Sequence, residues 1–206
     1  MNPILKVLDA RGLPCPQPVI LARKALAEGG FDTLEIRVDD PASLENLQKF
    51  AAHAGCQVAS VAEAGGVTRV QLTPPDGNPA RTEAAAIAPP ALGAAGAAVV
   101  LLTAEGIGQG DPDLARLLMR GFLYTLTEAD PPPRRLLLMN GGVKLAVEGS
   151  ESLANLKKLE GRGVEVLSCG TCLEFFALTP TLAVGGLTNL YDIAGFLLEG
   201  PALSLG

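Results

Sequence analysis

Residues 12–18 read GLPCPQP and separate a strand-like stretch, ILKVLD (residues 4–9), from an apolar helical pattern that continues to Glu28. A proline holds its own φ near the helical value and pushes the residue before it toward an extended conformation. We therefore predict that a strand ends before this segment and that a helix begins at Pro16, with Cys15 as its N-cap residue. This strand-to-helix step starts the first domain.

The thiol of Cys15 is the first candidate functional group. Pro16 and Pro18 have no backbone N–H, so the N–H of Gln17 is the obvious main-chain donor left for the Cys15 sulfur. Cysteines at helix N-termini have pKa values of roughly 3.5 to 7.5, against about 8.5 for a free thiol. The hypothesis is that Cys15 is a nucleophile; the alternative is that it is a small apolar cap.

The first 73 residues predict a two-layer α/β domain. Apolar residues alternate in the strand-like stretches and recur at helical spacing between the first three of them, and two glycines join the last two strands. The order βαβαββ allows two helices to pack on one face of a four-stranded sheet. The predicted elements are strands at 4–9 and 33–39, helices at 16–28 and from Asp40 or Ser43 to Gly55, and a hairpin of 56–63 with 66–73.

Residues 74–96 are rich in Pro, Ala and Gly without apolar periodicity, and they predict a linker to a second domain at residues 97–206. That domain alternates apolar strands with helical patterns, which indicates a doubly wound, mostly parallel sheet. The predicted strands are 97–103, 134–140 and 163–168; the predicted helices are about 111–128, 150–160 and one after a turn within 183–200; whether residues 181–184 form a strand is left open.

The motif SCGTC places Cys169 and Cys172 at the carboxyl end of a predicted strand, where open α/β sheets present reactive groups. CxxC spacing allows chemistry between two neighbouring sulfurs. The alternatives are half of a zinc site, two small buried residues, or an accident of composition. Because zinc needs four ligands and no second CxxC or HxxxH pair exists, we expect a reactive pair without metal or cofactor.

Other polar residues have ordinary explanations. Lys144 could pair with a thiolate, but an exposed lysine is usually a solvated charge, and Arg11 beside Cys15 has the same ambiguity. Asn140 is expected to be a turn residue, and the GIGQGD loop (residues 106–111) matches no phosphate-binding fingerprint. His53 and Cys56 are expected to be structural.

Composition narrows the classes of partner. The chain has 206 residues and a formal net charge of −6, with no run of Lys and Arg, so nucleic acid is a poor candidate. The longest weakly polar run, residues 91–104, is too short to span a bilayer, and no signal-peptide pattern begins the chain. We expect a cytoplasmic protein without membrane contact.

The residues of both halves resemble known families. DARGLPCPQPVILARKAL (residues 9–26) and VDDPASLENLQKFAAHAGCQV (residues 38–58) resemble the TusA/SirA sulfur-carrier family, whose CPxP signature stands here at residues 15–18. The second half, with QGD, NGGVKL, CGTCLEFF and VGGLTNLYDI in order, resembles DsrE-like domains. The combination resembles the YedF family of selenium-metabolism proteins over nearly the whole chain.

The resemblance implies a relay of sulfane sulfur or selenium as a cysteine-bound persulfide or selenosulfide. Cys15 takes the place of the carrier cysteine, and either Cys169 or Cys172 that of a second sulfur acceptor. It implies a donor such as a cysteine desulfurase, an acceptor protein, and, because DsrE-like proteins form oligomers, a homo-oligomer. Whether the protein is an enzyme or a carrier stays open. The alternatives are a CxxC dithiol oxidoreductase and a non-catalytic sulfur- or selenium-binding module.

Overall fold

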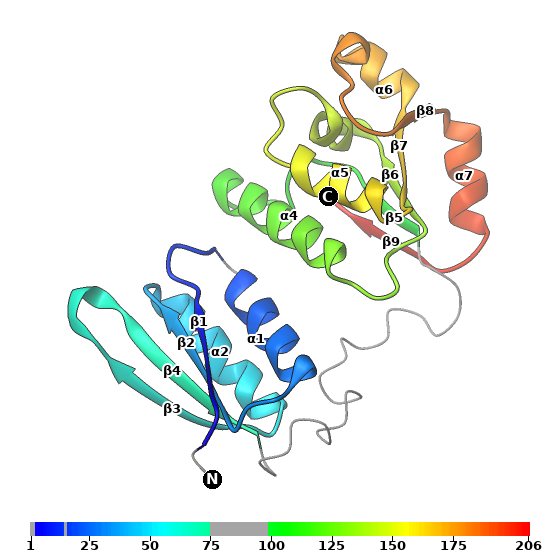
Figure 1. Cartoon of the computed structure of the whole chain (residues 1–206). Coiled ribbons are helices and arrows are strands. Elements are labelled where there is room, and N and C mark those ends of the chain that lie inside the picture. The colour runs from blue at the N-terminus through cyan, green and yellow to red at the C-terminus, as the bar shows by residue number, and fades with distance from the viewer. Residues whose placement is uncertain (1–2, 15, 75–98) are drawn as a thin grey trace. The chain divides into compact units, whose positions relative to one another are not determined.

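The computed structural model describes residues 3–14, 16–74 and 99–206. The chain divides into two compact units, Met1–Pro89 and Pro90–Gly206, which we treat separately (Figure 1). Apart from Pro74, the predicted linker at 74–96 lies outside the described residues.

The first unit has the predicted βαβαββ order. Its sheet has the strand order β1-β2-β4-β3, in which β1 and β2 are parallel and the other neighbours are antiparallel. The elements are β1 (Leu5–Asp9), α1 (Gln17–Glu28), β2 (Thr33–Val38), α2 (Pro41–His53), β3 (Gln57–Ala62), the 3-10 turn η1 (Ala64–Gly66) and β4 (Thr68–Thr73).

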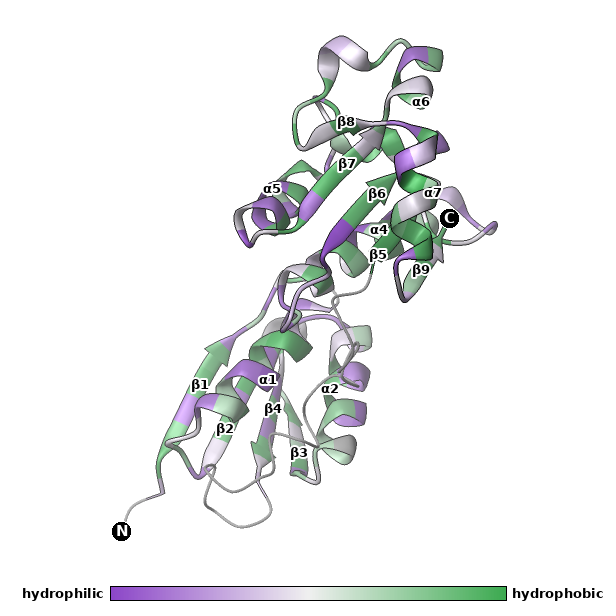
Figure 2. Ribbon diagram, turned by 90° about the vertical axis from the view of Figure 1, so that its right-hand side faces the viewer, coloured by the Kyte–Doolittle hydropathy of each residue, from purple (hydrophilic) through white to green (hydrophobic). Residues whose placement is uncertain are grey.

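Alternation along β2 builds the core of this unit. Leu34, Ile36 and Val38 are buried on one face of the sheet, and α1 and α2 pack side by side over that face (Figure 2). Burial of such side chains stabilises the fold by roughly 1.5 to 3 kcal/mol each. Asp40 caps α2, because its carboxylate accepts from the N–H of Ser43 at 2.8 Å. The sequence had left open whether Asp40 or Ser43 is the N-cap residue of this helix.

The second unit is a five-stranded parallel sheet in the order β8-β7-β6-β5-β9. Helices α4 and α5 lie on one face and α7 lies on the other, so the predicted doubly wound sheet is confirmed (Figures 1 and 2). The elements are β5 (Val99–Leu102), α4 (Pro112–Thr127), β6 (Arg135–Leu138), η2 (Asn140–Ala146), α5 (Leu153–Gly161), β7 (Glu165–Cys169), α6 (Gly170–Phe175), η3 (Thr179–Thr181), β8 (Gly186–Thr188), α7 (Leu190–Leu198) and β9 (Ala202–Leu205).

Two strands differ from the sequence prediction. The stretch expected to be only a turn before the last helix contains β8, and β9 was not predicted. The open question about residues 181–184 is also answered, since the strand lies two residues later, at Gly186. β5 and β6 each carry at least three consecutive buried apolar residues, whereas β8 (GLT) and β9 (ALSL) carry no such run, and both form through pairing with distant neighbours, β7 and β5.

Gly142 provides a test of this packing. A Cβ at Gly142 would lie 2.1 Å from the carbonyl oxygen of Leu102, a backbone atom that cannot rotate away. We expect Gly142→Ala to lower the free energy of unfolding of the second unit by about 1 to 3 kcal/mol. Gly161→Ala is the matched control, because a Cβ there meets no atom within 4 Å and alanine favours the helix.

The measurement is urea unfolding followed by tyrosine fluorescence. The chain has no Trp and two Tyr, and both Tyr124 and Tyr191 lie in the second unit, so the signal reports on that unit alone. Equal midpoints for Gly142→Ala and the wild type would show that η2 does not pack against β5 as described.

Candidate functional site

The CxxC cysteines lie at the carboxyl edge of the second sheet. Cys169 is the last residue of β7, and Cys172 lies in the following helix α6. The neighbouring strand β6 runs parallel to β7 with Leu138 opposite Ser168, so the segment that begins at Asn140 leaves the sheet beside the cysteines. All strands of this sheet are parallel, so each loop after a strand reaches the same edge.

Cys172 accepts a main-chain hydrogen bond. The N–H of Asn140 donates to its Sγ over 3.1 Å. Asn140 has φ of 50°, in the left-handed region that Asn tolerates better than most residues. The turn residue predicted from the sequence is therefore also a donor to the candidate reactive sulfur. The sequence indicated the turn at Asn140, but it gave no indication that Cys172 is the hydrogen-bond partner.

The two sulfurs differ in access to solvent. Cys169 is 2% exposed and belongs to the core, whereas Cys172 is half-buried. Burial raises the pKa of the Cys172 thiol, the N–H of Asn140 lowers it, and the side chain of Cys169 raises it again through a hydrogen bond. At neutral pH Cys172 is therefore mainly a thiol, and it is the more accessible of the pair.

Lys144 does not pair with the cysteines. Its ammonium group lies 2.9 Å from the carboxylate of Glu105 and 4.9 Å from the centre of the Phe176 ring. The suggestion that Lys144 balances a thiolate is therefore wrong for this structure, because a carboxylate already balances its charge.

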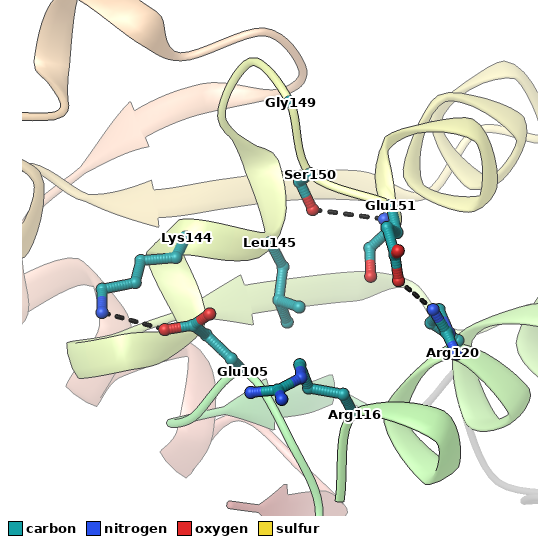
Figure 3. Close-up of a pocket in the computed structure, with 9 residues that line it drawn as sticks. Glu105, Arg116, Arg120, Lys144, Leu145, Gly149, Ser150 and Glu151 are labelled. Carbon is teal, nitrogen blue, oxygen red and sulfur yellow. Dashed lines mark hydrogen bonds and ion pairs between the residues drawn. The ribbon is translucent and has the colours of Figure 1, made fainter. Parts of the chain in front are cut away.

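A cavity of about 200 Å³ lies beside Lys144, between α4 and the segment that leads into α5 (Figure 3). Its cations are all paired with carboxylates: Lys144 with Glu105, Arg120 with Glu151, and Arg116 with Asp113. An anionic ligand would have to displace these carboxylates, so the cavity is not a ready-made phosphate site.

The start of α1 differs from the prediction. The helix begins at Gln17, and Pro16 occupies the N-cap position with φ −98° and ψ 14° and no side-chain cap bond. The N–H of Gln17 donates to the carbonyl of Pro14 at 2.9 Å, so it is not the free donor predicted for the Cys15 sulfur. Cys15 itself lies outside the described residues.

The remaining N–H of the first turn is also occupied. Val19 donates to the carbonyl of Pro16 at 3.1 Å, and Pro18 has no N–H. In the described part of this first turn, the N–H groups of Gln17 and Val19 are therefore both bonded to backbone carbonyls. The helix dipole remains, since it arises from the whole of α1.

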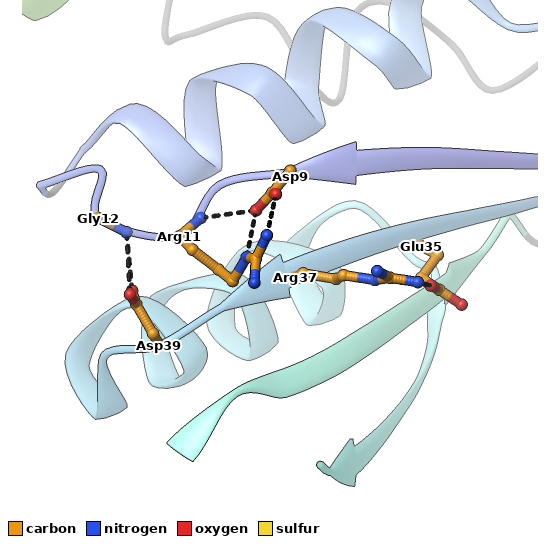
Figure 4. A network of polar contacts seen from close by, with 6 residues as sticks. All are labelled: Asp9, Arg11, Gly12, Glu35, Arg37 and Asp39. Carbon is orange, nitrogen blue, oxygen red and sulfur yellow. Dashed lines mark hydrogen bonds and ion pairs between the residues drawn. The ribbon is translucent and has the colours of Figure 1, made fainter. Parts of the chain in front are cut away.

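A network of charged side chains holds the segment before Cys15 (Figure 4). Arg11 donates two hydrogen bonds to the carboxylate of Asp9, at 2.8 and 2.6 Å, and this pairing lowers the pKa of Asp9 to about 2. The N–H of Gly12, with φ of 69°, donates to both carboxylate oxygens of Asp39 at 2.9 and 3.1 Å. Asp9 and Asp39 were not among the residues predicted for the site; Asp9 pairs with Arg11 two residues away, whereas the contact of Asp39 with Gly12 depends on the parallel pairing of β1 with β2.

Cys56 lies in the core as expected, whereas the side chain of His53 lies outside the described structure. Cys56 is 9% exposed and packs in the first core, and burial raises the pKa of its thiol. The backbone of His53 ends α2. Among the described residues, no group of three or more His, Cys, Asp or Glu side chains converges as a metal site would require. No helix within those residues is long and apolar enough to cross a membrane.

Comparison with known proteins identifies the first unit. Residues 6–73 match the family described as sulfurtransferase TusA. The sulfur carrier protein TusA of Allochromatium vinosum is 37% identical over 60 residues, which make up 29% of this chain and 79% of that relative. The first unit is thus a TusA-like sulfur carrier domain. Through this domain, the chain belongs to the TusA family of sulfur carrier proteins.

Two solved structures also resemble parts of the chain. The crystal structure of the SirA-like protein from Desulfitobacterium hafniense is 39% identical with a TM-score of 0.31, over 34% of this chain and 96% of that chain. The ychN protein from E. coli is 20% identical with a TM-score of 0.42, over 53% of this chain and 99% of that chain.

The raised pKa of Cys172 predicts how this thiol reacts. Alkylation of residues 163–206 by iodoacetamide should increase with pH with a midpoint above about 8.5, the value for a free thiol. Cys169→Ala should lower this midpoint, because the Cys169 side chain raises the pKa of Cys172. The tryptic peptide 163–206 contains both cysteines, so its mass reports single alkylation. A midpoint below that of a free thiol would contradict the burial of Cys172.

The Asp39 contact predicts the rigidity of the segment before Cys15. Asp39→Ala should speed amide exchange of Gly12 roughly tenfold, which corresponds to a hydrogen bond worth about 1.4 kcal/mol. Asp39→Asn keeps an acceptor oxygen and should exchange at nearly the wild-type rate. Amide exchange followed by NMR measures both variants. Equal exchange in Asp39→Ala and the wild type would show that Asp39 does not hold this segment.

Proposed function

We propose that the chain relays sulfane sulfur, with Cys15 as the carrier thiol of the first unit. The observation that carries this proposal is the TusA-family match, whose residues 6–73 include the complete CPQP motif. The contacts of Arg11 with Asp9 and of Gly12 with Asp39 support it, because they hold the chain just before the carrier position.

The chemistry of loading is a transfer between thiols. The Cys15 thiolate attacks the outer sulfur of a donor persulfide, the sulfur-sulfur bond of the donor breaks, and the donor leaves as a thiolate. Cys15 then holds the outer sulfur as a persulfide anion. An acceptor thiolate attacks that sulfur in the same way and regenerates the Cys15 thiolate. No electrons are lost or gained overall, so neither cofactor nor metal is needed.

In this proposal, the second unit is a DsrE-like acceptor domain and Cys172 is its accepting thiol. Cys172 is more exposed than Cys169 and already receives a hydrogen bond from Asn140. The donor is a cysteine desulfurase or a similar persulfide-bearing protein. Selenium, transferred by the same steps as a selenosulfide, is the second cargo proposed, as in the YedF family that the chain resembles.

A dithiol oxidoreductase is the second candidate function. It is favoured by one observation: Cys169 stands at the N-cap position of α6 and Cys172 at its third residue, so the two thiols lie within one helical turn. It gives the CPQP motif no role. The discriminating result is insulin reduction: an oxidoreductase reduces insulin equally well with Cys15→Ser, whereas a relay loses sulfur loading with that variant.

The test of the relay is intact-mass analysis after incubation with a cysteine desulfurase and either cysteine or selenocysteine. We expect the wild type to gain one sulfur or selenium atom on the tryptic peptide 12–23, whose only cysteine is Cys15. Cys15→Ser should lose this adduct completely. Cys56→Ala is the matched control and should load normally, because Cys56 is buried in the core. Loading of residues 12–23 in Cys15→Ser, or none in the wild type, would overturn the relay.

A further inference from the structure

The two cysteines of the second unit have unequal surroundings, which suits them for different steps of one reaction. Cys172 is half-buried, and its Sγ is fixed by the N–H of Asn140 at 3.1 Å. Cys169 is 2% exposed and stands at the N-cap position of α6, three residues before Cys172. An external sulfur donor can therefore reach Cys172. Cys169 is shielded from such donors, and the sulfur available to it is that of Cys172.

We propose that this pair discharges a sulfur or selenium atom bound on Cys172 as hydrosulfide or hydroselenide, so that the second unit acts as a persulfide reductase. This inference rests on the proposed function, which loads Cys172. The inference adds a reductive last step to the relay. In this step the sulfur or selenium atom is released as a free ion, in addition to being transferred to an acceptor protein.

The reaction balances without an outside reagent in its first turnover. The sulfur of Cys169 attacks the inner sulfur of the Cys172 persulfide, which is Sγ of Cys172 itself. A Cys169–Cys172 disulfide forms, the bond to the outer sulfur breaks, and the outer sulfur leaves as hydrosulfide with the proton of Cys169. The outer sulfur gains two electrons and the two cysteines lose them. A small dithiol reductant then restores both thiols for the next turnover.

The positions of the groups favour attack at the inner sulfur. Cys169 stands at the N-cap position of α6 and Cys172 at its third residue, a pair of positions whose side chains meet at the start of a helix. The N–H of Asn140 points at Sγ of Cys172 and polarises the atom that is attacked. Lys144, the cation of the neighbouring η2 segment, is paired with Glu105, so it does not hold the outer sulfur as a stored anion.

Burial assigns the roles of the two thiols. If the thiol that attacks the persulfide were exposed to solvent, it would itself accept sulfur from donors. The two cysteines would then have no separate roles. Cys169 lies in the core among side chains such as Val166 and Leu173 and is shielded from such donors. Since the attack on Cys172 is internal, this shielding does not prevent it, and proximity gives it a large effective concentration.

The experiment uses the full chain loaded by a cysteine desulfurase and cysteine, then freed of reagents, without added reductant. Hydrosulfide is trapped with monobromobimane, and the mass of the tryptic peptide 163–206 is measured after alkylation. We expect the wild type to release hydrosulfide and to show the disulfide on residues 163–206. Cys169→Ser should keep the extra sulfur on this peptide and release hydrosulfide at least about tenfold more slowly, because the internal attack is lost.

Cys172→Ser is the second variant, since it changes the more exposed thiol and disturbs the core less. It should show neither extra sulfur on residues 163–206 nor hydrosulfide, whereas Cys56→Ala should match the wild type. Equal release from the wild type and Cys169→Ser, or normal release from Cys172→Ser, would overturn the reductase. Failure of the relay is distinct: residues 12–23 then acquire no sulfur in any variant.

Discussion

The parallel pairing of β6 with β7 is the constraint on which the second unit depends. Leu138, the last residue of β6, lies opposite Ser168, and β7 ends one residue later at Cys169, at the same edge of the sheet. That register places the N–H of Asn140 against the sulfur of Cys172. Leu136, Leu137 and Leu138 are all fully buried, so both faces of β6 are covered, and the backbone pairing with β7 fixes where the donor lies.

In the second unit, the two thiol groups Cys169 and Cys172 differ in their exposure to solvent. Cys169 ends a buried strand and lies in the core, while Cys172 follows after one helical turn and reaches the edge of the protein. Burial keeps the pKa of Cys172 high, so its thiol is not an activated thiolate at rest.

In the first unit, side-chain carboxylates hold the segment just before Cys15. Gly12 is held by Asp39, which follows β2, and Arg11 is paired with Asp9 at the end of β1. The N–H groups of the first turn of α1 bond to carbonyls of Pro14 and Pro16. The segment before Cys15 is therefore positioned by the sheet, through pairing of β1 with β2, and α1 contributes its dipole.

Sequence alone determined the order of the elements. Period-two alternation identified β2, helical spacing identified α2, and continuous apolar runs identified β5 and β6, because each pattern lies within one element. It also located Cys15, Cys169 and Cys172 as the candidate thiols. The short strands β8 and β9 were missed, since three or four residues become a strand only beside a partner.

The tertiary structure decided which groups meet. The hydrogen bond from Asn140 to Cys172 joins residues 32 positions apart. The hydrogen bond from Gly12 to Asp39 spans 27 positions, and the ion pair of Lys144 with Glu105 spans 39. The difference in burial between Cys169 and Cys172 likewise arises from packing against other elements. Local patterns report on neighbours along the chain, whereas hydrogen bonds, ion pairs and burial depend on distances in space, which only the folded chain defines.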